Sequence, residues 1–163
     1  MQNTTDKEAL LREGKNYIEK FKGKAFVIKY GGSTLDDEEV SKWILEDIVT
    51  LHSQGMKIVV VHGGGAVISK LMQERGKEPV FIGGFRVTDE ETAAIVEEAL
   101  NIVNADIAKR IKLIGAEAAS IVSHEHGSIK ARKKEGAPAE DFLGDVHFIE
   151  TAPIVEALAK GVI

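Results

Sequence analysis

The chain has 163 residues, 44% of them hydrophobic, and a net charge of -5, which suits one compact domain and argues against non-specific nucleic-acid binding, since that needs a broad basic surface. It has no cysteine, so disulfides, thiolate zinc sites and thiol nucleophiles are excluded. No apolar run approaches the ~20 residues of a membrane-spanning helix, and the first residues are acidic where a signal peptide would be basic and then apolar, so we expect a cytoplasmic protein.

The first predicted element is an amphipathic helix over residues 5–21. Residues 5–8 have the form of a capping box, apolar residues follow at roughly helical spacing, and Gly23 is the predicted stop. The helix either faces solvent or buries its apolar residues against the domain's own core or a neighbouring subunit, and we favour the neighbour. We therefore divide the chain into residues 1–23, an N-terminal helix and candidate oligomerisation element, and residues 24–163, the main domain.

Two strand–helix pairs follow, each joined by a glycine-rich turn. Buried strands are expected at residues 25–28 and 57–61, and helices at about 37–54 and in a short segment that ends at Gly76. The expected inward side chains of the two helices are Trp43, Ile44, Ile48, Leu51, Val67, Ile68, Leu71 and Met72. This alternation predicts an α/β fold, a three-layer sandwich with a mostly parallel central sheet and ligands at the carboxyl ends of the strands.

Beyond the second pair, the sequence predicts a hairpin and a long helix. Gly83 and Gly84 lie inside an otherwise extended segment, and residues 88–91 form a second capping box that opens a helix to about residue 112.

The last part of the chain predicts three strands and one helix. The strands are expected at residues 118–122, 129–131 and 146–148, and the helix starts near Pro153. The apolar pair at residues 162–163 follows a helix stop, where another strand would ordinarily begin, so we expect the chain to be part of a longer unit.

The two glycine-rich turns, Lys29-Tyr30-Gly31-Gly32 and His62-Gly63-Gly64-Gly65, predict a phosphate site. A strand that ends in glycines before a helix lets backbone N–H groups approach an anion closely, and the helix N-terminus adds partial positive charge. Lys29 would add a mobile cation. Single glycine motifs are common in α/β folds, so each turn alone could be purely structural, whereas several motifs in order favour function.

Three motifs in order resemble those of the N-acetylglutamate kinases, within the amino acid kinase family. They are Lys29-Tyr30-Gly31-Gly32, Val59-Val60-Val61-His62-Gly63-Gly64-Gly65 and Gly84-Phe85-Arg86-Val87-Thr88-Asp89. The similarity runs from the leading helix to Val162 and covers the family's N-terminal, acceptor-binding lobe. The nucleotide-binding lobe, with its asparagine-rich segment, aspartate loop and second lysine, is expected to be absent.

The resemblance implies ATP-dependent phosphorylation, with Mg²⁺, of the side-chain carboxylate of N-acetylglutamate in arginine biosynthesis. A carboxylate is already ionised at neutral pH, so the acceptor needs no general base. The reaction instead needs positioning and neutralisation of charge. On the family pattern, Lys29 stabilises the transferring phosphoryl group, Gly31 and Gly32 line its path, and Arg86 holds a substrate carboxylate. Gly64 and Gly65 would face the acceptor.

The resemblance also implies a homodimer or hexamer, in which the leading helix interlaces dimers. We expect the chain to bind N-acetylglutamate without turnover unless a separate nucleotide-binding subunit completes it, because the electrostatic preorganisation for transfer is otherwise missing. Two alternatives stay open. One is a non-catalytic sensor of acylated amino acids, and the other is a kinase lobe for a related acceptor such as N-acetyl-aminoadipate.

Two histidine motifs invite other interpretations. His62 could be a general base, but before three glycines it is expected to hydrogen-bond to the loop backbone. His124-Glu125-His126 could bind a metal, but adjacent strand positions point to opposite faces and the sequence offers no third ligand. We expect a solvated loop there and no metal site. Residues 123–126 also depart from the family pattern.

Overall fold

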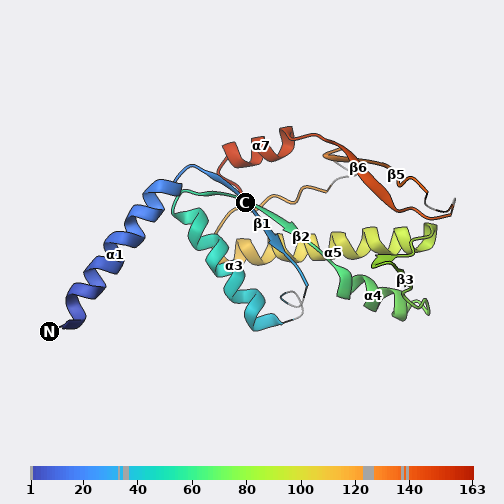
Figure 1. Ribbon diagram of the computed structural model, residues 1–163, viewed down its shortest axis with the longest axis horizontal. Helices are drawn as coiled ribbons and strands as arrows, with labels where there is room; N and C mark the ends of the chain where they lie inside the picture. Colours follow the sequence, from blue (N-terminus) through green and yellow to red (C-terminus); the bar gives the residue numbers. More distant parts are fainter. Residues whose placement is uncertain (1, 33, 35–36, 123–126, 137, 139) are drawn as a thin grey trace.

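A computed structural model describes the chain except for residues 1, 33, 35–36, 123–126, 137 and 139 (Figure 1). Helices alternate with strands along the chain, which confirms the α/β class. The elements are α1 (Gln2–Phe21), β1 (Ala25–Tyr30), α3 (Glu38–Ser53), β2 (Lys57–His62), α4 (Gly65–Glu74), β3 (Phe81–Ile82), β4 (Phe85–Arg86), α5 (Glu90–Ile114), β5 (Ile129–Lys133), β6 (Gly144–Ile149) and α7 (Ala152–Ala159).

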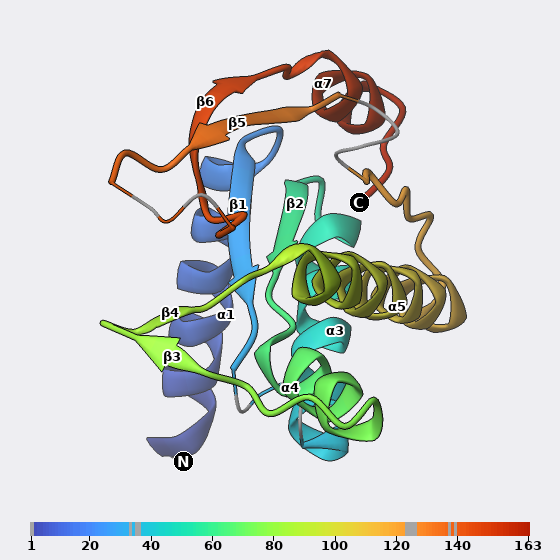
Figure 2. The same ribbon diagram turned by 90° about the vertical axis from the view of Figure 1, so that its right-hand side faces the viewer.

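The strands β1 and β2 pair in parallel and form the middle layer. Their register runs from Ala25 opposite Lys57 to Tyr30 opposite His62. Helices α3 and α5 cover one face of this pair, and α7 lies on the other side against β2 (Figures 1 and 2). Because parallel strands end at the same edge of a sheet, the two glycine turns come to one side of the molecule. Strands β3 and β4 form an antiparallel hairpin, and β5 pairs with β6 in the same sense.

Helix α5 is the central support of the core. Its buried aliphatic side chains recur every four residues and form one stripe, as expected for a helix that packs along its whole length. They are Ile95, Ala99, Val103, Ile107 and Ile111. The first two pack with Ile68 and Met72 of α4, and the other three pack with β1, β2 and α3. The helix therefore holds α4, and with it the second glycine turn, in a fixed place beside the sheet.

The expected burial was wrong at several residues of β1, β2 and α3; Val61 of β2 is 50% exposed and Leu51 of α3 is 39% exposed. Residues 25–28 were expected as a buried strand, but Val27 is 71% exposed, because alternate residues of β1 point to a face that the described chain leaves open. In α3 the inward stripe consists of Ser41, Leu45 and Ile48, so that Trp43 is 54% exposed. The expected inward residues of α4 are confirmed, with Ile68 and Met72 buried.

Several element boundaries also differ from the expectation. Helix α1 begins at Gln2, three residues before the expected capping box. Helix α5 is capped by Asp89, not Thr88, since the Asp89 carboxylate accepts from the N–H of Thr92.

Residues 118–122 form no strand, although they were expected to. The backbone there still pairs, because the N–H of Ala119 donates to Ile163 O at 2.8 Å and the N–H of Ile163 donates to Glu117 O at 3.0 Å. Because both of these bonds involve the single residue Ile163, the paired stretch is too short to define a β-strand. None of the described helices has the length and apolar character to span a membrane.

Candidate functional site

The two glycine turns lie against each other at the carboxyl edge of β1 and β2. The N–H of Gly63 donates to the carbonyl oxygen of Tyr30 at 3.1 Å. A Cβ at position 31 would lie only 3.3 Å from the backbone nitrogen of Gly63, tighter than an ordinary van der Waals contact. Gly31 therefore allows the close approach of the two turns, which the strand pattern placed at the same edge of the sheet.

Gly64 and Gly65 form the start of α4. Gly64 is the N-cap, its carbonyl accepts from the N–H of Ile68 at 2.8 Å, and it is buried against Leu100 of α5. Neither residue has a side chain that could cover the helix end. The first N–H groups of a helix have no partner within the helix and carry partial positive charge, so this end can attract an anion.

Lys29 is exposed near the end of β1, opposite Val61 in the parallel register. Within the described part of the chain its ammonium group makes no ion pair or hydrogen bond. A lysine that is not engaged elsewhere can move toward a bound anion.

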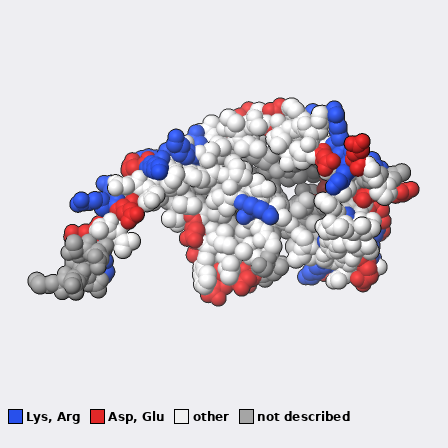
Figure 3. Space-filling model, viewed as in Figure 1, with Lys and Arg blue, Asp and Glu red and all other residues white. Residues whose placement is uncertain are grey.

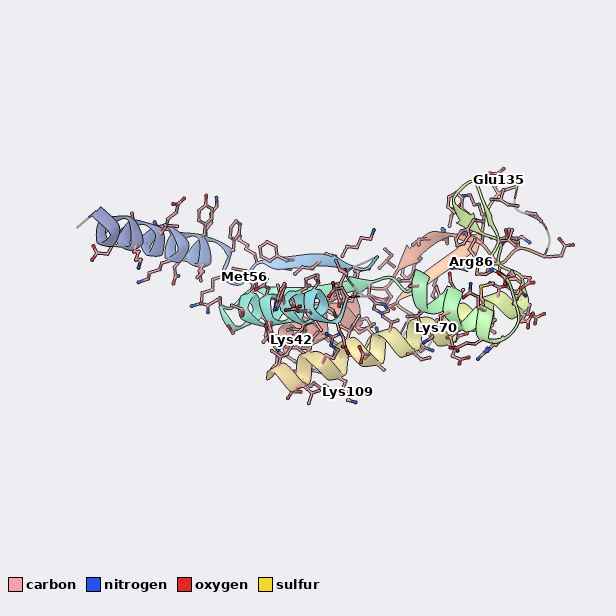
Figure 4. All side chains as sticks on the ribbon, turned by 90° about the horizontal axis from the view of Figure 1, so that it is seen from below. Lys42, Met56, Lys70, Arg86, Lys109 and Glu135 are labelled. Atoms are coloured by element: carbon pink, nitrogen blue, oxygen red, sulfur yellow. The ribbon has the colours of Figure 1, made fainter. Side chains whose placement is uncertain are left out.

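Arg86 is held against α4 by several contacts (Figure 4). Its guanidinium donates to Ser69 Oγ at 2.9 Å, to Met72 Sδ at 3.1 Å and to Gly65 O at 3.4 Å. The group also stacks on the Phe81 ring, with 4.6 Å from Cζ to the ring centroid. Partial burial lowers the pKa of the Arg86 guanidinium, a group so basic that it stays charged in proteins. The arginine is therefore fixed beside the second glycine turn.

An ion-pair cluster fixes the segment that carries Arg86. Lys77 Nζ lies 2.6 Å from Asp89 Oδ1 and 2.8 Å from Glu91 Oε2, which ties the end of α4 to the start of α5. The hydrogen bond to Asp89 raises the pKa of Lys77, and the same bond lowers the pKa of Asp89 far below its usual range.

The β5–β6 ribbon contacts the β3–β4 hairpin. Lys134 Nζ lies 3.9 Å from the centroid of the Phe85 ring, and the N–H of Phe142 donates to Thr88 O at 2.6 Å. The β3–β4 hairpin is therefore held by α4 through Arg86 and by the β5–β6 ribbon through Phe85.

The structure joins some of the predicted site residues directly and not others. Gly31 meets the second turn, and Arg86 reaches Gly65, whereas Lys29 has no contact with Arg86. Two open hollows, of about 520 and 570 Å³, lie along α5 and between α3 and α5, and neither is lined by a predicted site residue. The residues that seat Arg86, namely Ser69, Met72 and Phe81, were missed from the sequence.

The two histidine motifs have different outcomes. His62 Nδ1 lies 3.0 Å from Gly63 O, which confirms the expected bond to the loop backbone. His124-Glu125-His126 lies outside the described residues. Among the residues that are described, no group of three His, Cys, Asp or Glu side chains could hold a metal ion.

Comparison with known proteins gives consistent matches. The profile of the amino acid kinase family matches residues 24–163. The acetylglutamate kinase of Clostridium kluyveri is 37% identical over 162 residues, which are 99% of this chain and 57% of that protein. The acetylglutamate kinase of Methanocaldococcus jannaschii is 44% identical over 130 residues, which are 79% of this chain and 43% of that protein. The chain thus spans about half the length of these curated relatives.

Solved structures show the same fold. The crystal structure of smu.665 from Streptococcus mutans UA159 matches with a TM-score of 0.74 and 27% identity, over 86% of this chain and 56% of that one. The N-acetylglutamate synthase of Neisseria gonorrhoeae, solved with coenzyme A and N-acetyl-glutamate, matches with a TM-score of 0.77 and 23% identity, over 95% of this chain and 36% of that one. Together with the profile match over residues 24–163, these likenesses show that the chain belongs to the amino acid kinase family.

Proposed function

We propose that this chain forms the acceptor-binding lobe of an acetylglutamate kinase. The acceptor N-acetylglutamate would lie at the edge where the two glycine turns meet, with one carboxylate on Arg86. The observation that carries this proposal is the seat of Arg86, whose guanidinium is held within 3.4 Å of Gly65 O by contacts from α4 and β3. A guanidinium has five N–H donors, of which these contacts occupy three, so a carboxylate can accept from the remaining donors of a cation that is already held in place.

The chemistry of the proposed reaction fits the groups at this edge. The acceptor carboxylate is already ionised, so no base is required, and the lobe has to position it and offset negative charge. Lys29 is the cation that we assign to the transferring phosphoryl group. Gly31 and Gly32 would line its path, and the N–H groups of Gly64 and Gly65 would face the acceptor.

ATP and Mg²⁺ are not assigned to the described residues. Mg²⁺ would neutralise phosphate charge, and it prefers carboxylate oxygens and water as ligands. The described residues hold no carboxylate cluster suited to it. The chain spans about half the length of its curated relatives, and we propose that nucleotide and metal bind mainly outside the described residues and that this chain alone binds the acceptor without transferring phosphate.

Calorimetric titration of the purified chain with N-acetylglutamate tests this proposal. We expect binding that Arg86→Ala abolishes. The matched control is Arg75→Ala, which removes an exposed arginine at the end of α4. Arg75 pairs with Glu98. We expect Arg75→Ala to bind like wild type. N-acetyl-aminoadipate serves as competitor, and tighter binding of it would favour the related acceptor. Absence of heat from either ligand, or full binding by Arg86→Ala, would contradict the proposal.

A further inference from the structure

A chain of hydrogen bonds joins three segments behind the second glycine turn. The Ser120 hydroxyl donates to Asn104 Oδ1, and Asn104 Nδ2 lies 3.1 Å from His62 Nε2. On the other side of the ring, His62 Nδ1 lies 3.0 Å from the carbonyl oxygen of Gly63. The chain of bonds therefore runs from the segment after α5, through α5 itself, to the last residue of β2 and the peptide that follows it.

The chemistry of the two outer groups determines where the proton of the His62 ring lies. A carbonyl oxygen only accepts, so Nδ1 must carry the proton that it shares with Gly63. An amide nitrogen only donates, so Nε2 must be the unprotonated acceptor of Asn104. Ser120 favours this orientation of the amide, because a hydroxyl that donates to Oδ1 turns the NH₂ group toward the ring. Both sides require the same state, a neutral imidazole with its proton on Nδ1.

The bond from His62 selects the orientation of the peptide between Gly63 and Gly64. The described chain has no cis peptide bond, and in a planar trans peptide the C=O and the N–H point in opposite directions. With the Gly63 carbonyl tied to the ring, the N–H of Gly64 is directed away from it. Glycines allow many backbone orientations, so a side-chain bond is needed to hold one of them.

We propose that Asn104 is a positioning residue of the acceptor site. It holds His62 in the Nδ1–H tautomer, and His62 in turn sets the direction of the Gly64 N–H. The proposal rests on the proposed function, which assigns Gly64 to the acceptor. It gives His62 no role as a base, because the Nε2 lone pair that would take a proton is engaged by Asn104.

The first test is the tautomer of His62, read from long-range ¹H–¹⁵N spectra at about pH 8, where an unperturbed imidazole is neutral. His62→Gln assigns the signals. In wild type we expect a protonated Nδ1 and an unprotonated Nε2. In Asn104→Asp a carboxylate faces Nε2 and can only accept, so we expect the proton on Nε2. Asn101→Asp, on the preceding turn of α5, is the matched control and should leave the tautomer unchanged. A wild-type ring protonated on Nε2 would overturn the proposal.

Ser120→Ala is a second variant in case Asn104→Asp does not fold, because Ser120 is exposed. It frees the Asn104 amide to rotate, so we expect a mixture of the two tautomers and a shifted Gly64 amide signal. An unchanged spectrum would contradict the role assigned to the amide.

The second test is the affinity for N-acetylglutamate. Loss of one aimed hydrogen bond predicts a decrease of about five- to tenfold in Asn104→Asp and none in Asn101→Asp. An altered tautomer with unaltered affinity would overturn the positioning role. A wild-type chain with the expected tautomer but no affinity for N-acetylglutamate would instead overturn the proposed function, and the tautomer assignment would stand.

Discussion

At the scale of single residues, Gly64 has a packing requirement that Gly65 lacks. A Cβ at position 64 would lie 3.0 Å from Leu100 Cδ2, whereas a Cβ at position 65 would meet no heavy atom within 4 Å. We expect Gly64→Ala to lower the free energy of unfolding by about 1 kcal/mol, since the leucine methyl must shift inside a packed contact. Gly65→Ala, the matched control, should be neutral or slightly stabilising because alanine favours the helix. Denaturant unfolding measures both, and a Gly64→Ala chain as stable as wild type would contradict this packing.

The sequence suggests candidate site residues, but it did not predict the contacts that hold them in place. Arg86 is recognisable from its motif, and the parallel strands were enough to bring the glycine turns together. The partners of Arg86, Ser69 and Met72, are 17 and 14 residues away from it in the sequence. Asn104 is 42 residues from His62. Such contacts depend on how α4 and α5 pack against each other. Local spacing carries no signal for that packing.

At the scale of elements, the link between α4 and α5 depends on the ion pairs of Lys77. The lowered pKa of Asp89 gives stabilisation above its unfolded value of about 4, which is lost as the pH falls further. The raised pKa of Lys77 gives stabilisation that is present below about pH 10 and lost as the pH rises through its folded pKa. Both contributions are therefore complete between about pH 5 and 9.

We expect Lys77→Met to lower the Tm by a constant amount in this range, and the difference from wild type to shrink below about pH 4. Thermal unfolding followed by circular dichroism across the pH range measures this. Lys70→Met is the control, because Lys70 is exposed and lies 3.9 Å from Glu74, where a surface pair contributes little. A loss of Tm that does not change with pH would show that Lys77 acts through packing alone.

The elements also show where sequence patterns fail. The hairpin and the long helix were predicted because glycine pairs and caps are local signals, yet the cap of α5 is Asp89 and not its neighbour Thr88. Both side chains can cap a helix, and the pull of Lys77 on Asp89 is a tertiary contact. The exposure of Trp43 has the same origin, since the side of α3 that is buried depends on where α5 lies.

At the scale of the whole molecule, α1 extends away from the body and carries mixed charges (Figures 1 and 3). Among its described side chains, Phe21 in the last turn packs edge-on against Phe26, with ring centroids 5.6 Å apart. Leu10 is 69% exposed and Tyr17 is 53% exposed. We propose that a second copy of the chain covers this apolar stripe, because exposed apolar side chains gathered on one helix favour association.

Sedimentation velocity of the intact chain tests this proposal. We expect wild type to self-associate and Leu10→Asn to shift the distribution toward the monomer. Lys15→Asn is the matched control, because it places the same residue on the same helix without removing apolar surface. It should sediment like wild type. A monomeric wild type, or equal effects of both variants, would contradict a role of α1 in association.

We propose that an acylated amino acid binds where the glycine turns meet Arg86. The most direct measurement is an NMR titration of ¹⁵N-glycine-labelled chain with N-acetylglutamate. We expect the amide signals of Gly31, Gly32, Gly64 and Gly65 to shift and those of Gly115 and Gly161 to stay in place. We also expect Arg86→Ala to remove the shifts. Shifts that spare the glycine turns, or that persist in Arg86→Ala, would contradict the proposal.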